Sequence, residues 1–134
     1  MTALVLDASM AVAWALDETA PGKEAALKGI EDDGALVPCL WWFELRNGLV
    51  VNERRGRLSE SETARFLGRI AQMPITIDRS PDEAQMLSLA RRHRLTVYDA
   101  AYLELALREG LPLATLDRAL AGAAQTEGVL LIGG

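Results

Sequence analysis

The stretch ALVLDASMAVAWAL, residues 3–16, places a short apolar run in front of a longer helical pattern. Residues 3–6 are all apolar and too few for a helix, which is typical of a buried strand that ends at Asp7. In the segment that follows, Met10 and Trp14 are four residues apart and so share one face of a helix. A continuous apolar strand followed by a helix is the building unit of a parallel sheet that helices cover on both faces.

The same alternation continues along the chain and predicts a three-layer α/β/α sandwich. Its central parallel sheet is expected to have about five strands, at residues 3–6, 35–38, 74–77, 111–116 and 129–132. The helices are expected at residues 8–16, 22–33, 40–55, 59–72, 80–93, 99–110 and 117–128. No repeat, low-complexity tract or linker interrupts the pattern, so residues 1–134 are interpreted as one domain.

Residue types typical of helix starts mark several of these boundaries. Ser59 is followed three residues later by Glu62, the capping-box pattern in which each side chain bonds the backbone N–H of the other residue. Ser80 is expected to cap the next helix, because Pro81 suits the first helical position. Asp99 is expected to cap the helix that follows it.

Composition narrows the classes of protein and of site. Half of the 134 residues are hydrophobic, enough for a buried core, and no run of about 18 uncharged apolar residues is present to span a bilayer. The N-terminus lacks a signal-peptide pattern, so we expect a cytoplasmic protein with no membrane association. Cys39 and His93 are the only cysteine and histidine, which excludes an internal disulfide, a multi-cysteine zinc site and a paired-histidine metal site.

The charge of the chain is unevenly distributed. The net charge is −5, so a general attraction to polyanions is not expected. Residues 46–69, however, carry six arginines and three acids. This segment could contact a phosphate backbone, and a solvated helix face with i,i+4 ion pairs explains the same charges equally well.

Two aromatic pairs also carry expectations. Trp41 and Trp42 are adjacent and point about 100° apart on a helix, so one is expected in the core and the other at an interface. Tyr98 and Tyr102 are interpreted as packing residues rather than as platforms on which nucleic-acid bases stack.

Four acidic residues recur beside the predicted strands and helices. Asp7 and Asp117 each follow a strand, and the carboxyl ends of parallel strands meet at one edge of a sheet, where ligands bind. Asp99 begins a helix and could reach the same edge, and Glu44 lies within the first two turns of another helix. Each acid taken alone is also explained as a helix cap or as a partner of the helix dipole.

As a set, these four acids predict a bound cation. Carboxylates brought together in one crevice repel each other and lose hydration, which costs stability. Mg²⁺ or Mn²⁺ removes this repulsion and needs only oxygen ligands, so neither histidine nor cysteine is required. Chemistry with carboxylates and such ions points to phosphoryl or phosphodiester substrates.

Four segments, taken in order, resemble the PIN-domain family: LVLDAS at residues 4–9, ELRNGL at 44–49, YDAAYLELA at 98–106 and ATLD at 114–117. The likeness extends over nearly the whole chain and points, within the family, to the VapC-type toxin ribonucleases. The resemblance implies that the catalytic and metal-binding residues are Asp7, Glu44, Asp99 and Asp117. It also implies a supporting role, through orientation of a carboxylate or a metal-bound water, for Ser9, Asn47 and Thr115.

The activity implied by the resemblance is hydrolysis of RNA phosphodiester bonds by an endoribonuclease that uses Mg²⁺, with Mn²⁺ as a substitute. Such a protein is the toxin of a type II, VapBC-like toxin–antitoxin pair. Members of the family form dimers and bind a small antitoxin. The expected partners are therefore RNA, a VapB-like antitoxin, and further copies of the chain in a homodimer or a toxin–antitoxin hetero-oligomer. The alternative is a catalytically inactive PIN-like module that binds protein or RNA.

Overall fold

The fold is built around a short parallel sheet whose strands all end at one edge. The computed structural model describes residues 2–133, and within them the sheet has the order β3-β2-β1-β4. The strands are β1 (Leu4–Leu6), β2 (Ala35–Pro38), β3 (Ile75–Asp78) and β4 (Leu113–Ala114), and each neighbouring pair is parallel. Val5 pairs with Leu36 on one side and Leu113 on the other, so the residue that follows β1 lies between two strand ends.

The fifth predicted strand is present only as a single bridge. Leu131 pairs with Leu113 in parallel, and the backbone N–H of Ile132 donates to the carbonyl of Leu113 at 3.0 Å. The neighbouring Leu130 is 75% exposed, so its side chain does not continue the core. The sheet of residues 2–133 therefore has four strands and one additional bridge where about five strands were predicted.

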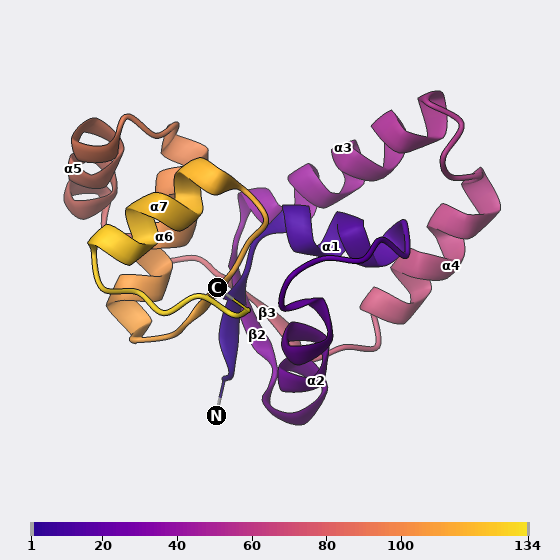
Figure 1. The fold of residues 1–134 in the computed structure, drawn as a ribbon, viewed down its shortest axis with the longest axis horizontal. Helices are drawn as coiled ribbons and strands as arrows, with labels where there is room; N and C mark the ends of the chain where they lie inside the picture. Colours follow the sequence, from indigo (N-terminus) through magenta and orange to yellow (C-terminus); the bar gives the residue numbers. More distant parts are fainter. Residues whose placement is uncertain (1, 134) are drawn as a thin grey trace.

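Helices cover both faces of the sheet, which confirms the predicted α/β/α sandwich (Figure 1). On one side lie α1 (Ala8–Ala15), α2 (Lys23–Asp33), α3 (Leu40–Arg54) and α4 (Glu60–Ile70). On the other side lie α5 (Glu83–His93), α6 (Val97–Glu109) and α7 (Arg118–Thr126). In Figure 1, α3 and α4 extend away from the sheet, whereas α6 lies against it and contacts β1, β2 and β4. No helix within residues 2–133 is both long and apolar enough to cross a membrane.

One of the two helix starts that the sequence predicted from serine is confirmed. Ser59 accepts a hydrogen bond from the N–H of Glu62 at 3.1 Å, and Glu62 accepts one from the N–H of Ser59 at 2.9 Å. The predicted start at Ser80 is wrong, because α5 begins only at Glu83, after an N-cap at Asp82. Serine and aspartate are about equally good N-caps, and it is Asp82 whose carboxylate accepts the first-turn N–H of Gln85, at 3.1 Å.

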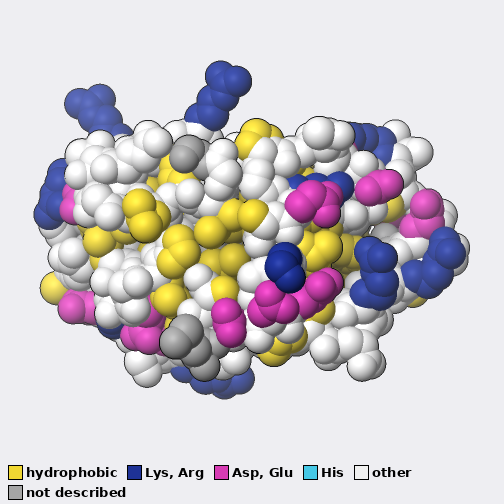
Figure 2. Space-filling view, turned by 60° about the horizontal axis from the view of Figure 1, so that its bottom comes forward, with side chains coloured by type: hydrophobic (Ala, Val, Ile, Leu, Met, Phe, Trp, Pro, Cys, Tyr) yellow, Lys and Arg dark blue, Asp and Glu magenta, His cyan; other side chains and the backbone are white. Residues whose placement is uncertain are grey.

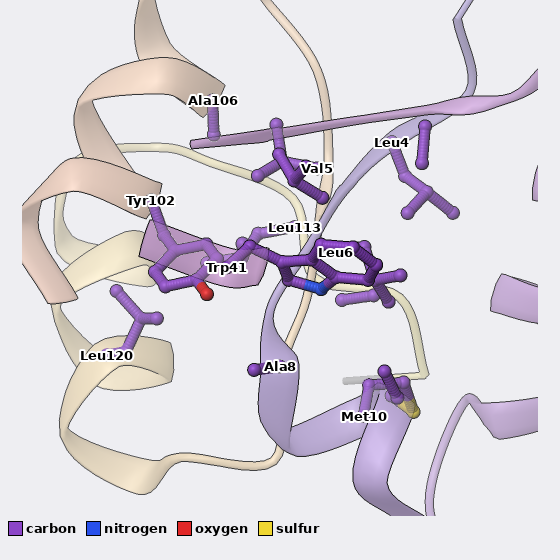
Figure 3. Close-up of a cluster of buried hydrophobic side chains, with 14 of the residues drawn as sticks. Leu4, Val5, Leu6, Ala8, Met10, Trp41, Tyr102, Ala106, Leu113 and Leu120 are labelled. Carbon is purple, nitrogen blue, oxygen red and sulfur yellow. The ribbon is translucent and has the colours of Figure 1, made fainter. Parts of the chain in front are cut away.

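The core lies between the sheet and the two helical layers, and Figure 3 shows Trp41 and Tyr102 in one buried cluster with side chains of β1. Trp41 is 3% exposed and Trp42 is 43% exposed, which confirms that only one of the two packs in the core. Tyr102 is fully buried, as a packing residue should be. Tyr98 is 63% exposed, so its interpretation as a packing residue is wrong; it lies in the first turn of α6, on the side turned away from the core.

A close crossing of α1 and α3 determines where α3 lies. Gly48 approaches Val12 so closely that a Cβ atom at Gly48 would lie 2.7 Å from Cγ2 of Val12. Glycine is required here for the close approach of the helices rather than for a special backbone conformation. Glu44 lies one turn before Gly48 on the same face of α3, so the crossing also brings Glu44 toward the end of β1.

Candidate active site

Asp7 lies at the carboxyl end of the central strand and is 6% exposed. Its Oδ2 atom accepts hydrogen bonds from Oγ of Ser9 at 2.7 Å and from Oγ1 of Thr115 at 2.6 Å. Asp7 occupies the N-cap position of α1, but its side chain makes no capping hydrogen bond to the described first turn of that helix. Burial raises the pKa of Asp7 although the two hydroxyl donors oppose the shift, and the charge of Asp117 adds to it.

Ser9 and Thr115 connect Asp7 to the loop between β4 and α7. The backbone N–H of Leu116 donates to Oγ of Ser9 at 3.0 Å, and that of Asp117 donates to Oγ1 of Thr115 at 3.0 Å. Each hydroxyl therefore accepts from the loop and donates to Asp7. Two segments more than 100 residues apart are held in register around one carboxylate.

Glu44 is held by Tyr102, a contact that reasoning from the sequence missed. The Tyr102 hydroxyl donates to Oε1 of Glu44 at 2.6 Å. Burial raises the pKa of Glu44, the tyrosine hydrogen bond opposes this, and the charges of Asp7, Asp99 and Asp117 raise it further. Burial also raises the pKa of Tyr102, so the phenol keeps its proton and remains a donor. The signal in the sequence is the i,i+3 spacing from Asp99, which places Tyr102 on the same side of α6.

Asp99 lies in the first turn of α6 but is not its cap. Thr96 is the N-cap, and its Oγ1 accepts the N–H of Asp99 at 3.0 Å. The predicted capping role of Asp99 is therefore wrong, because the helix begins at Val97, two residues earlier than expected, behind the threonine. The carboxylate of Asp99 is half-buried, and burial together with the charges of Asp117 and Asp7 raises its pKa.

Asp117 combines a structural role with a place at the site. Its Oδ1 accepts the N–H of Leu120 at 2.9 Å, so Asp117 is the N-cap of α7. Its charge contributes to the raised pKa of Asp7, Glu44 and Asp99. Asp117 can serve both as a helix cap and as an acid of the cleft, because Oδ1 accepts the N–H of Leu120 and Oδ2 remains available.

The four acids line one cleft of about 460 Å³ between α1, α3 and the starts of α6 and α7. Asn47, an exposed residue of α3, lies on its wall, and Arg55 and Arg57 line it at the end of α3. The cleft is thus lined by six of the seven predicted site residues: Asp7, Ser9, Glu44, Asn47, Asp99 and Asp117. The seventh, Thr115, reaches it through its hydrogen bond to Asp7.

The electrostatics of the cleft favour a cation. None of the four carboxylates has an ion-pair partner within residues 2–133, and the pKa of three of them is raised. Across the same residues, no three His, Cys, Asp or Glu side chains are grouped closely enough to form a ready coordination shell. The available donors are oxygen atoms only, and this donor chemistry fits Mg²⁺ or Mn²⁺ rather than metals that prefer nitrogen or sulfur.

Comparisons with known proteins agree with this fold. A sequence model of the PIN domain matches residues 4–125, a span that contains all seven predicted site residues. Ribonuclease VapC3 from Pyrobaculum aerophilum is 35% identical to this chain over 123 residues, which cover 88% of this chain and 92% of the relative. The crystal structure of PAE2754 from Pyrobaculum aerophilum is similar with a TM-score of 0.74 and 26% sequence identity, covering 98% of this chain and 90% of that one.

Proposed function

The chain belongs to the PIN domain family, and on that premise we propose that it is a metal-dependent endoribonuclease and the toxin of a VapBC-like pair. The observation that carries the proposal is the meeting of four carboxylates, from four separate segments of the chain, on one cleft at the end of a parallel sheet. A relative that covers most of the chain is named as a ribonuclease. Carboxylates without a counter-charge are suited to hydrolysis of phosphodiesters with a divalent cation.

The four acids are the residues that would hold Mg²⁺, or Mn²⁺ in its place. When bound, the ion supplies positive charge next to the phosphoryl oxygens and lowers the pKa of its water ligands. The other residues of the site prepare the carboxylates for this role. Ser9 and Thr115 orient Asp7 through their hydroxyls, and Tyr102 bonds only one oxygen of Glu44, so the other remains available.

The proposed substrate is unpaired RNA. An unpaired strand can place its backbone and its bases in the cleft, whereas the deep groove of an A-form duplex keeps the base edges away from side chains. Asn47 and Arg55 offer hydrogen-bond donors to the strand along the cleft wall. On the face drawn in Figure 2, basic side chains are scattered among acidic and apolar ones rather than gathered in one patch, so this face offers no single basic surface for RNA.

We also propose that the chain binds a VapB-like antitoxin and forms a homodimer or a toxin–antitoxin hetero-oligomer. Large apolar side chains that are 38–70% exposed on α3 and α6 support this part of the proposal: Trp42, Phe43, Val50, Val97 and Tyr98. Such side chains, aromatic ones above all, are enriched where a partner covers the surface.

RNA cleavage is the experiment that tests the proposed activity. The purified chain is expected to cleave single-stranded RNA in the presence of Mg²⁺ or Mn²⁺, and a chelator is expected to stop the reaction. Asp7→Asn and Asp99→Asn are each expected to abolish measurable cleavage, because each removes a carboxylate of the site at nearly constant shape. Arg54→Gln, on the exposed end of α3 outside the cleft, serves as the control. Cleavage that persists in both aspartate variants would falsify the assignment of this site.

The same assay separates the enzyme from a catalytically inactive PIN-like binding module. Such a module binds RNA or protein but produces no cleavage with either metal ion, and the aspartate substitutions then change nothing that the assay measures. Co-purification with a small antitoxin encoded next to the chain tests the toxin role independently of catalysis.

A further inference from the structure

We propose that the RNA strand crosses the acidic cluster between two arginines, Arg55 and Arg118, and that each of them binds one of its phosphates. This inference rests on the proposed function, because it concerns the path of that substrate. Two observations support it. Two hollows meet at the acidic cluster, and Arg55 and Arg118, which line them, have no side-chain partner within residues 2–133.

The cleft with the four acids adjoins a second hollow of about 460 Å³. The second hollow lies between the segment after α1, the start of α7 and the end of the described chain. Glu18 and Asp117 line both hollows, so the two meet at these residues. A strand that passes from one hollow into the other therefore passes Asp117, and in the acidic cleft it lies beside the other three acids. Apolar side chains, among them Pro21, Leu116 and Ile132, line much of the second hollow and suit an unstacked base.

Arg55 is the arginine of the acidic cleft that is available for a ligand. Its neighbour in the cleft, Arg57, donates to Glu18 at 2.9 Å and to Asn52 at 3.2 Å and is thus already engaged. Arg55 is exposed at the end of α3, and its guanidinium has no side-chain partner within residues 2–133. Arg54, at the same end of α3, lines neither hollow.

Arg118 holds the corresponding position on the other side of the cluster. It is the first residue of α7, directly after Asp117, and it is exposed on the wall of the second hollow. No side chain within residues 2–133 pairs with it. A cation is unfavourable at the N-terminus of a helix, where the macrodipole is positive, so helix stability does not account for an arginine here. A bound anion does.

Arg55 and Arg118 offset the repulsion between the phosphates of the proposed substrate and the four carboxylates. Phosphates that approach four carboxylates are repelled, and one cation on each side of the cluster offsets this repulsion. A guanidinium binds two phosphate oxygens through parallel N–H groups, so each arginine also fixes the strand in place. With one phosphate on Arg55 and another on Arg118, an intervening phosphate lies over the acids.

The salt dependence of RNA binding tests this path. Fluorescence anisotropy is measured with a mixed-sequence single strand of about a dozen nucleotides, a length typical of single-strand sites. Binding is measured both in the Asp7→Asn background and in wild type with a chelator, so that the RNA stays intact. Arg55→Gln and Arg118→Gln are each expected to reduce the slope of log affinity against log salt by about 0.7, and the double variant by about 1.4.

Matched variants separate a specific contact from diffuse attraction. Arg54→Gln and Arg91→Gln remove exposed arginines outside both hollows and are expected to leave the slope unchanged. Arg55→Lys and Arg118→Lys keep the charge and are expected to restore the slope. Thermal melts identify any glutamine variant whose fold has changed. In that case, the slopes of Arg55→Lys and Arg118→Lys are compared with the slopes of Arg54→Gln and Arg91→Gln.

The outcomes distinguish this path from the proposed function. An unchanged slope in Arg118→Gln overturns the two-sided path even if Arg55→Gln behaves as expected. An equal reduction in Arg54→Gln also overturns it, in favour of diffuse attraction. If the protein binds and cleaves RNA with no change in any of these slopes, only the path fails. If it neither binds nor cleaves RNA, the proposed function fails together with the path.

Discussion

Tyr102 of α6 donates a 2.6 Å hydrogen bond to Glu44 of α3 and thereby joins the two helical layers across the end of the sheet. The tyrosine ring is buried in the core, so the position of its hydroxyl is set by packing. Glu44 lies on the other layer, where the crossing of α3 with α1 sets its position. The position of the Glu44 carboxylate thus depends on core contacts between residues that are far apart in the sequence.

Tyr102→Phe tests this dependence, because it removes the donor and keeps the ring. The free energy of unfolding is expected to fall by about 1 kcal/mol. The hydrogen bond lowers the pKa of Glu44 against the effect of burial, so its loss raises that pKa further. The acidic limb of the pH–rate profile for RNA cleavage is then expected to move to higher pH, with lower activity at neutral pH. Tyr98→Phe, on the exposed side of the same helix, should change neither quantity. A profile that does not move contradicts the role given to the hydrogen bond.

Gly48→Ala is expected to push α1 and α3 apart. The new methyl group meets Cγ2 of Val12 at 2.7 Å, and overpacking of this kind costs about 1–3 kcal/mol. Because Glu44 moves with α3, RNA cleavage is expected to fall as well.

A matched glycine and a compensating variant make the Gly48 prediction specific. Gly68 lies in α4 with no other atoms near the Cβ position, so Gly68→Ala should stabilise the protein by up to about 1 kcal/mol through helix propensity alone. Val12→Ala should relieve the clash, so that the double variant with Gly48→Ala is more stable than additivity of the two single changes predicts. Strict additivity would show that the crossing does not fix α3.

The pH dependence of stability, measured in a chelator, tests the repulsion among the acids. The pKa of Asp7 is higher in the folded state than in the unfolded state. The protonated form of Asp7 therefore stabilises the fold in acid, and this stability is lost as the pH rises from the ordinary aspartate pKa through the folded-state pKa. Asp7→Asn does not titrate. Urea unfolding is therefore expected to show the variant gaining stability relative to wild type as the pH rises toward neutrality.

Glu62→Gln supplies a control of opposite sign for this measurement. The capping box with Ser59 lowers the pKa of Glu62, so its contribution is present above the ordinary glutamate range and is lost as the pH falls. This variant is expected to lose stability relative to wild type as the pH rises. A parallel pH dependence of the Asp7 and Glu62 variants would contradict the electrostatic description of the cleft.

A buried ion pair on α6 accounts for another part of the fold's stability. Glu104 is 1% exposed and accepts two hydrogen bonds from Arg108, at 2.6 and 3.1 Å, while Arg108 also bonds Asp78 at the end of β3. Arg108→Met leaves the buried carboxylate without a partner and is expected to cost about 3–5 kcal/mol in urea unfolding. Arg92→Met breaks a pair in which the arginine is half-exposed and should cost less than about 1 kcal/mol. Equal costs would refute the distinction.

Much of the fold was predictable because its signals are local. Continuous apolar runs marked β1, β2 and β3, and the capping box marked the start of α4. The errors arose where neighbouring residues compete. Asp82 displaced Ser80 as a cap, and Thr96 displaced Asp99, because both alternatives lie within a few residues and only the folded backbone decides between them. The strand predicted at residues 129–132 forms only the bridge between Leu131 and Leu113. Strand pairing depends on the backbone of the neighbouring strand as well as on apolar character.

The positions of two acids of the candidate site were predictable for a different reason. Strand ends and helix starts fix Asp7 and Asp117 on one edge of a parallel sheet whatever the details of packing. The contacts between them were not predictable, because they join residues far apart in the chain. The i,i+3 spacing from Asp99 indicates the side of α6 on which Tyr102 lies, but it does not identify Glu44 as the partner of Tyr102. The pairing of Arg57 with Glu18 has no signature in local spacing.

Metal binding is expected to appear as a thermal shift. An ion that binds the folded chain alone stabilises it, by about 2.7 kcal/mol at a concentration of about 100 Kd, so Mg²⁺ and Mn²⁺ should raise the melting temperature of wild type. Asp117→Asn is the informative variant, because asparagine caps a helix as well as aspartate does. The variant should retain the hydrogen bond to Leu120, melt without metal at the wild-type temperature or above it, and show a smaller shift with metal.

Asp82→Asn completes this test, because Asp82 is also an N-cap but does not line the cleft. Its metal-induced shift should equal that of wild type. If the four acids served only as caps and dipole partners, Mg²⁺ would move none of the three melting temperatures. If the ion bound by nonspecific attraction to an acidic protein, Asp82→Asn and Asp117→Asn would reduce the shift equally. A reduction confined to Asp117→Asn therefore separates a bound ion in the cleft from both alternatives.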